Sequence, residues 1–181
     1  MVSRFPNPIQ GFGRPNVENV LYFSTPSPDG KYPASNMNLF LEDATDINRL
    51  ATGSEREFCF FHSPDRADGG GPLVVTLTWT DPAGSPAGAK ALVNDLDLEI
   101  RDTCGAIHTP HSAWEKDAEA LTQDQLEAHG LQRDPSGALR DRINNVERLV
   151  LPDGGAGCFP QSRRVYVRVV GHYVPEGPQS F

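Results

Sequence analysis

A run of alternating apolar and acidic residues near the middle of the chain restricts the fold most. Within 92–100 (LVNDLDLEI), apolar residues at 96, 98 and 100 alternate with acids at 95, 97 and 99. Successive side chains of a β-strand point to opposite faces of its sheet. This spacing therefore predicts a strand with one apolar face and one acidic face.

Four further segments carry strand signals, and turn residues separate them. The segment 73–80 is rich in β-branched and aromatic residues, and 164–171 places valines at alternate positions. The chain also contains 17 Gly and 16 Pro, which is high for a helical protein and suits short strands joined by turns. These features predict an all-β fold with strands at 57–61, 73–80, 92–100, 146–151 and 164–171.

The acidic balance of the chain excludes some classes of partner. The formal net charge is -8, which disfavours nucleic acid and anionic membrane surfaces because these are bound through Lys and Arg. No apolar run approaches the roughly 18 residues of a transmembrane helix. We therefore expect no nucleic acid and no membrane among the partners, and carboxylates suited to holding cations.

The three cysteines have different surroundings. Cys59 lies in an apolar run, so we expect it to pack as a small buried hydrophobic residue. Cys104 and Cys158 lie in glycine-rich turns, where a disulfide between them is one of the open alternatives in an oxidising compartment. No cysteine and histidine spacing indicates zinc.

Three stretches depart from the strand pattern. Residues 108–140 are acidic and helix-prone; Thr122 can cap a short helix there and Gly130 can end it, which predicts an elaborated surface loop. Near the start, a Gly-x-Gly turn and Pro15 precede a short amphipathic stretch, which predicts a helix of about two turns. Residues 24–38 have the composition of a linker.

Several segments, in order along the chain, resemble one protein family. The match covers roughly residues 57–181 and is similar to the C-terminal domain of alkaline subtilisin-like serine proteases. Residues 11–21 resemble the last helix of the catalytic domain in the same family. The segments that carry the resemblance of the C-terminal domain are 73–81 (LVVTLTWTD), 91–100 (ALVNDLDLEI), 142–151 (RINNVERLVL) and 169–181 (VVGHYVPEGPQSF).

The resemblance implies an all-β jelly-roll sandwich, similar to galactose-binding domains and to the P-domain of convertases. It implies that 1–23 is a remnant of the catalytic domain and that 24–56 is a linker with the first barrel segment. Residues 57–181 would form the barrel, with a loop insertion at about 108–140. The implied role is stabilisation, often with bound calcium. The implied partners are the parent catalytic domain and, through that enzyme, protein substrates, in a secreted or endomembrane compartment.

The chain lacks the residues that a subtilase needs for catalysis. The nucleophilic serine of the family lies in a Gly-Thr-Ser-Met-Ala segment, and no such segment is present. The sequence Thr52-Gly53-Ser54 reverses that order. Without nucleophile and base there is no acyl transfer, so we predict no catalytic residues. The alternative to a stabilising domain is a jelly-roll module that binds carbohydrate or protein.

Carboxylates near two strand ends are the candidate calcium ligands. Calcium takes carboxylate and carbonyl oxygens, so Asp81 with carbonyls of the 82–88 loop, such as that of Gly84, forms one predicted cluster, and Asp95 or Asp97 forms a second. The alternative for Asp81 is a carboxylate that caps a turn. The alternative for the strand acids is a solvated face, which we favour for Glu99.

Two other polar groupings have more ordinary interpretations. Asn144 and Asn145 precede a strand; they can bind calcium or pin the loop, but an Asn-rich turn is the preferred interpretation. His108 and His111 are the closest histidine pair, and we expect a surface pair because no third metal ligand is near in sequence.

Overall fold

The computed structural model describes residues 14–15, 39–45, 48–61, 72–88, 90–110, 122–128, 130–151 and 164–181. The chain divides into two compact units, Met1–Leu41 and Glu42–Phe181, and all described helices and strands belong to the second. Apart from residues 14–15, the helix predicted near the start lies outside the described residues, as does the linker at 24–38. No helix in the described ranges is long and apolar enough to cross a membrane.

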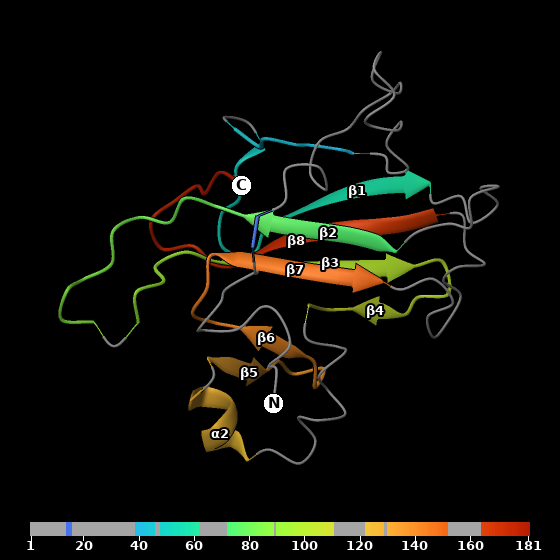
Figure 1. Ribbon diagram of the computed structural model, residues 1–181. Helices are drawn as coiled ribbons and strands as arrows, with labels where there is room; N and C mark the ends of the chain where they lie inside the picture. Colours follow the sequence, from blue (N-terminus) through green and yellow to red (C-terminus); the bar gives the residue numbers. More distant parts are fainter. Residues whose placement is uncertain are drawn as a thin grey trace. The chain divides into compact units, whose positions relative to one another are not determined.

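The larger sheet is antiparallel and is built around β3 and β8 (Figure 1). Their register sets Leu98 opposite Val169 and Ile100 opposite Val167. Because side chains alternate along each strand, these apolar residues share one face of the sheet. The strand order is β1 (Glu55–Phe61), β8 (Arg164–Tyr173), β3 (Asp95–Asp102) and β4 (Ile107–His108).

A second, two-stranded antiparallel sheet consists of β2 (Leu73–Thr78) and β7 (Val146–Leu151). The inward residues of β2 and β7 join those of the larger sheet in one buried core, so the prediction of an all-β sandwich is confirmed. The buried members of this core are Leu50, Leu77, Trp79, Leu96, Leu98, Ile100, Leu149, Leu151, Val165, Val167, Val169 and Val174.

The segment before β1 pairs with the end of the chain. Leu50 and Gln179 exchange two main-chain hydrogen bonds of 2.9 and 2.8 Å, and the Ala44 amide donates to the carbonyl of Phe181 at 2.7 Å. Gly171 in β8 lets the main chain at Ala51 lie close to that strand, since a Cβ there would lie 2.3 Å from the carbonyl oxygen of Ala51. Both ends of the second unit are thereby attached to the sandwich.

A small helix and hairpin lie between β4 and β7 in sequence. The helix α2 (Gln123–Ala128) follows Thr122, whose amide donates to Gln125 Oε1 at 2.9 Å, while the Gln125 amide donates to Thr122 Oγ1 at 3.4 Å. This reciprocal cap confirms the helix predicted in the loop. The hairpin of β5 (Leu131–Arg133) and β6 (Leu139–Asp141) was not predicted, and it shares a small core of Leu126, Leu131 and Leu139 with the helix.

The cysteine predictions have different outcomes. Cys59 was expected to be buried, but it is exposed and carries a free thiol. Its neighbours Phe58 and Phe60 turn toward the core, so strand alternation directs Cys59 to the opposite side. Cys104 is disulfide-bonded. Cys158, considered above as its partner, lies outside the described residues.

A matched pair of strand valines tests the assignment of the core. Val165 in β8 is 0% exposed and Val150 in β7 is 41% exposed. We expect Val165→Ala to lower the free energy of unfolding by about 2 kcal/mol, because it removes buried methyl groups and leaves a cavity. Val150→Ala should cost less than about 0.5 kcal/mol. Urea denaturation checks both values, and equal losses would contradict the sandwich.

Candidate functional site

The acidic face of β3 is buried, contrary to the prediction of a solvated face for Glu99. Asp95, Asp97 and Glu99 are 8%, 6% and 5% exposed. They contact Arg140 and Arg142 from the β5–β6 hairpin and the residue after it. The strand therefore has an apolar face in the sandwich core and an acidic face covered by arginines.

Arg142 joins the first two acids of this face. Its Nη1 lies 2.7 Å from Asp97 Oδ1 and 3.3 Å from Asp95 Oδ1, and its side chain is buried. Burial raises the pKa of Asp95 to about 6; Asp97 and Asp141 add to the rise, and Arg142 opposes it. One guanidinium thus neutralises two carboxylates only in part.

Glu99 lies between two arginines. Arg140 and Arg168 donate to its two carboxylate oxygens, with Arg168 Nε at 2.9 Å. Burial raises the pKa of Glu99, but the hydrogen bonds from Arg168 and Arg140 outweigh burial and leave it below its ordinary value. Arg140 Nε also donates to Asp134 Oδ2 at 2.9 Å, so the charges form a connected network.

Glu147 in β7 completes the buried acidic set. Its Oε2 accepts the main-chain amide of Leu98 at 2.6 Å, on β3. Burial raises the pKa of Glu147 well above its ordinary value; the negative charge of Asp97 adds to this, and the Leu98 amide opposes it. The side chain thereby satisfies a strand-edge amide while its carboxyl is held toward the neutral form.

Asp81 makes the contacts of a capping residue. Its two oxygens accept the amides of Val93 and Asn94, both at 2.7 Å, which closes the loop between β2 and β3. Gly84 lies in the same loop, where a Cβ would come 2.5 Å from the carbonyl oxygen of Ala91. Of the two interpretations of Asp81, the turn-capping contact is the one present.

The acids of both predicted calcium clusters bond to N–H groups of the protein. Asp95 and Asp97 share Arg142, whereas Asp81 bonds main-chain amides and Gly84 packs against Ala91. In the described ranges no three side chains of His, Cys, Asp or Glu are placed to hold a metal ion. The carboxylates of Asp81, Asp95 and Asp97 accept hydrogen bonds from N–H donors in this structure, and calcium binding stays a prediction from the resemblance.

Three asparagines hold loops in place. The sequence left two interpretations open for Asn144 and Asn145, and it did not single out Asn94. Asn145 Nδ2 donates to the carbonyl of Trp79 at 2.8 Å, and Asn144 Nδ2 donates to Asp141 Oδ2 at 2.6 Å. Asn94 is completely buried, and its Nδ2 donates to the carbonyl of Glu176 at 2.6 Å. No sequence signal marked Asn94, because its partner lies 82 residues away.

The described histidines and serines do not form a catalytic arrangement. His108 Nε2 lies 3.6 Å from Asp102 Oδ2, and His172 Nδ1 lies 3.9 Å from Asp97 Oδ2. The hydroxyls of Ser54 and Ser136 bond to Ala51 and Asp134 instead. Within the described ranges, no serine is hydrogen-bonded to a histidine, and His111 lies outside them.

Comparison with known proteins gives similarity to one group. No protein-family model matches the chain. It is 31% identical over 137 residues, 73% of its length, to the serine protease/ABC transporter B family protein tagD of Dictyostelium discoideum. The corresponding values are 29% over 187 residues, 97% of the chain, for tagB of that organism, and 28% over 110 residues, 61% of the chain, for tagA.

The matched region is a small part of each relative. The chain spans 7% of tagD, 9% of tagB and 5% of tagA. The similarity therefore concerns one short region of proteins named as serine proteases and ABC transporters. It is consistent with a protease-related region.

The pKa of Asp95 predicts how stability depends on pH. Because the folded pKa is raised from 3.8 to about 6, the folded state holds a proton that the unfolded state releases between these values. Stability from this group is present below pH 3.8 and is lost as pH rises through about 6. Asp95→Asn cannot titrate. The stability of the unmodified chain relative to Asp95→Asn should therefore fall by roughly 1–3 kcal/mol between about pH 4 and pH 7.

Glu99→Gln is the control of opposite sign. The lowered pKa of Glu99 gives stability that is present above its ordinary value of 4.5 and is lost as pH falls through the lower folded pKa. Urea denaturation of the chain and both variants, from neutral pH down to a pH below the folded pKa of Glu99, checks the two signs. Parallel pH profiles for all three proteins would contradict the network.

Proposed function

We propose that this chain is the non-catalytic, stabilising C-terminal β-sandwich of a subtilisin-like serine endopeptidase. One observation carries the proposal: 97% of the chain is similar to a region that makes up 9% of a protein named a serine protease/ABC transporter B family protein. The four ordered segments that resemble the subtilase C-terminal domain support the same assignment. The peptidase activity would belong to another part of the parent protein.

The described contacts support a structural role. The sandwich has its own buried core, and a network of arginines and carboxylates fills the second face of its central strand. Removing one partner from a buried ion pair is costly, so such a network holds its segments in a single arrangement. A rigid domain that binds the folded catalytic domain, and not its unfolded form, stabilises that domain by mass action.

The partner proposed for this domain is the parent catalytic domain, with protein substrates reached through that enzyme. The net charge of -8 gives no support to nucleic acid or an anionic membrane as partners. The disulfide at Cys104 supports an oxidising location, such as a secreted or endomembrane compartment.

A carbohydrate- or protein-binding module is the alternative from a different functional class. Such modules present several exposed aromatic side chains on one face. In the second unit, Tyr173 is the exposed large aromatic residue among those described. Nothing in these residues favours the alternative over the stabilising role.

The stabilising role predicts that this domain lengthens the active lifetime of the parent protease. In the full-length protein that the proposal requires, deletion of 42–181 should shorten the half-life of peptidase activity at elevated temperature. The initial kcat/KM on a short peptide should stay unchanged, because the domain supplies no group to the reaction. Val165→Ala should shorten the half-life in the same direction and Val150→Ala should not, since only the first loosens the core.

The isolated chain is the control for this experiment. It should neither hydrolyse peptides nor react with a serine-directed fluorophosphonate. Labelling of the chain, or an unchanged half-life after the deletion, would overturn the proposal.

Calcium binding is a separate proposal that rests on the resemblance. If calcium stabilises the domain, EGTA should lower Tm by several degrees. Tm in EGTA should then differ from Tm in 1,10-phenanthroline, which is the transition-metal control. Asp81→Asn and Asp95→Asn should reduce that shift. Identical melting curves with calcium and with EGTA would contradict calcium binding and would leave the proposed stabilising role unaffected.

A further inference from the structure

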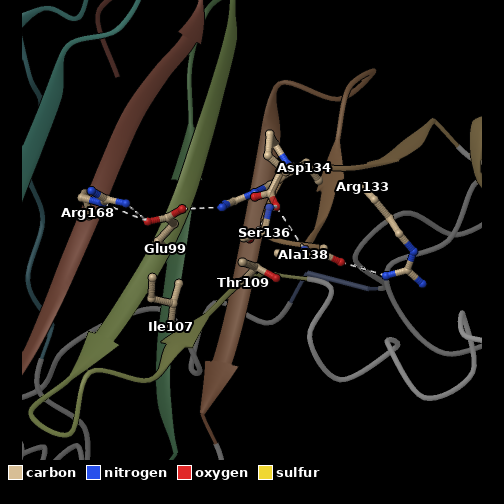
Figure 2. Close-up of a pocket in the computed structure, with 11 residues that line it drawn as sticks. Glu99, Ile107, Thr109, Arg133, Asp134, Ser136, Ala138 and Arg168 are labelled. Carbon is tan, nitrogen blue, oxygen red and sulfur yellow. Dashed lines mark hydrogen bonds and ion pairs between the residues drawn. The ribbon is translucent and has the colours of Figure 1, made fainter.

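The charged face of β3 is filled by side chains that pair with one another. Figure 2 shows Glu99 bonded to Arg168, and the other oxygen of this carboxylate accepts from Arg140. The small sheet of β2 and β7 is different. At one of its two edges, main-chain groups point away from the sheet and are bonded to no other described segment.

The register of the small sheet identifies these main-chain groups. The Trp79 amide donates to the carbonyl of Asn145 at 3.2 Å, and the two residues continue the β2–β7 register by one step. Hydrogen-bonded and non-hydrogen-bonded pairs alternate along an antiparallel ladder. The amides and carbonyls of Val74, Thr76 and Thr78 therefore point away from β7, and we call them the open edge of β2. In the described part of the chain, no hydrogen bond joins this edge to another segment.

β2 lacks the features that normally keep a free edge from pairing. Proteins protect edges with charged side chains, proline, bulges or very short strands. β2 has six residues, LVVTLT, and its register with β7 is continuous. By contrast, β1 begins with Glu55, Arg56 and Glu57, β7 carries Glu147 and Arg148, and β4 has two residues. Of the described strands, β2 alone has neither an acidic nor a basic residue.

The apolar core is also less covered at β1 and β2 than elsewhere. Phe58 and Phe60 of β1, and Leu73 and Val75 of β2, pack against the core but are only partly buried. The apolar core residues of β3, β7 and β8 are buried. Figure 1 shows β2 on the side of β7 that is nearer to β1. A further strand beside β2 would cover this part of the core with its alternate side chains.

We propose that the open edge of β2 binds an extended, uncharged segment from another part of the parent protein as a third strand of the small sheet. This inference rests on the proposed function, because the parent protein supplies the segment. The matched region makes up 9% of tagB, so most of a protein of that kind lies outside it. A segment of the same polypeptide is present at high effective concentration. Main-chain hydrogen bonds give such a contact its affinity, and alternate side chains give it specificity.

An uncharged strand fits this edge better than a second copy of the chain does. Each copy carries a net charge of -8, so two copies repel one another. A charged residue on the inward side of the added strand would be buried beside Leu73 and Val75, which is costly without a partner. We therefore expect apolar residues at alternate positions of the bound segment.

Hydrogen exchange of the isolated chain tests the edge directly. In the free chain, the amides of Val74, Thr76 and Thr78 should exchange faster than those of Val75 and Leu77, which bond to β7. The probe is the peptide acetyl-KTVTVTVTK-amide, and its control is the same peptide with every valine and threonine N-methylated. At saturation the probe should slow exchange of the three open-edge amides by at least about tenfold, and the control should not, because it has lost its strand N–H donors.

Two proline variants separate the open edge from the rest of the sheet. Thr76→Pro removes an outward N–H and no bond to β7, since proline is tolerated at such positions of an edge strand. Arg148→Pro is the matched control, because Arg148 is the register partner of Thr76 and its N–H points to the opposite edge of the sheet. Thr76→Pro should abolish binding of the probe and Arg148→Pro should retain it. The comparison of the two peptides decides the outcome even if a variant does not fold.

The same variants in the parent protein distinguish this inference from the proposed function. Thr76→Pro should shorten the half-life of peptidase activity toward that of the 42–181 deletion, and Arg148→Pro should shorten it much less. Equal half-lives for the two variants, with a shorter half-life for the deletion, would overturn the strand contact and leave the proposed function in place. No effect of the deletion would overturn the proposed function, and with it the parent protein as the source of the strand.

Three results with the isolated chain would also overturn the inference. The first is that the probe gives no protection of the open edge, and the second is that the N-methylated peptide gives equal protection. The third is a dimer, seen by sedimentation, that itself protects the amides of Val74, Thr76 and Thr78, because the occupant would then be a second copy.

Discussion

The burial of β3 on both faces is the constraint on which the rest of the structure depends. One face carries Leu96, Leu98 and Ile100 into the sandwich core, and the other carries acids that water cannot solvate. Each of those acids must find a donor inside the protein, since an unpaired buried charge is prohibitive. Arg140 and Arg142 supply the donors, and their positions hold the β5–β6 hairpin against the strand.

The same constraint explains why the pKa values of the network shift in opposite directions. Glu99, with an arginine at each oxygen, has a lowered pKa, whereas Asp95 and Glu147 have raised pKa values because burial exceeds their compensation. Carboxylates outnumber arginines near Arg142, whereas Glu99 is bonded by two arginines. The pKa shifts along this face therefore follow the number of arginines that each carboxylate contacts.

Much of the fold could be predicted from local sequence. Alternation identified β3 and β8, other local strand signals identified β1, β2 and β7, and Thr122 and Gly130 were expected to bound a helix. These features depend on residues within a few positions of one another. The candidate site could not be predicted in this way, because Glu99 lies 41 residues from Arg140 and 69 residues from Arg168 in sequence. The short β5–β6 hairpin that brings Arg140 there carried no recognised strand signal.

The sequence by itself determined which side chains share a strand face, the acidic net charge, and the lack of a subtilase serine segment. Only the tertiary structure decided that the acidic face is buried, that Cys59 is exposed, and that Asp81 caps a loop. Side-chain direction follows from backbone periodicity, which is local. Burial and pairing depend on which distant segments pack together, and no spacing within a strand specifies those segments.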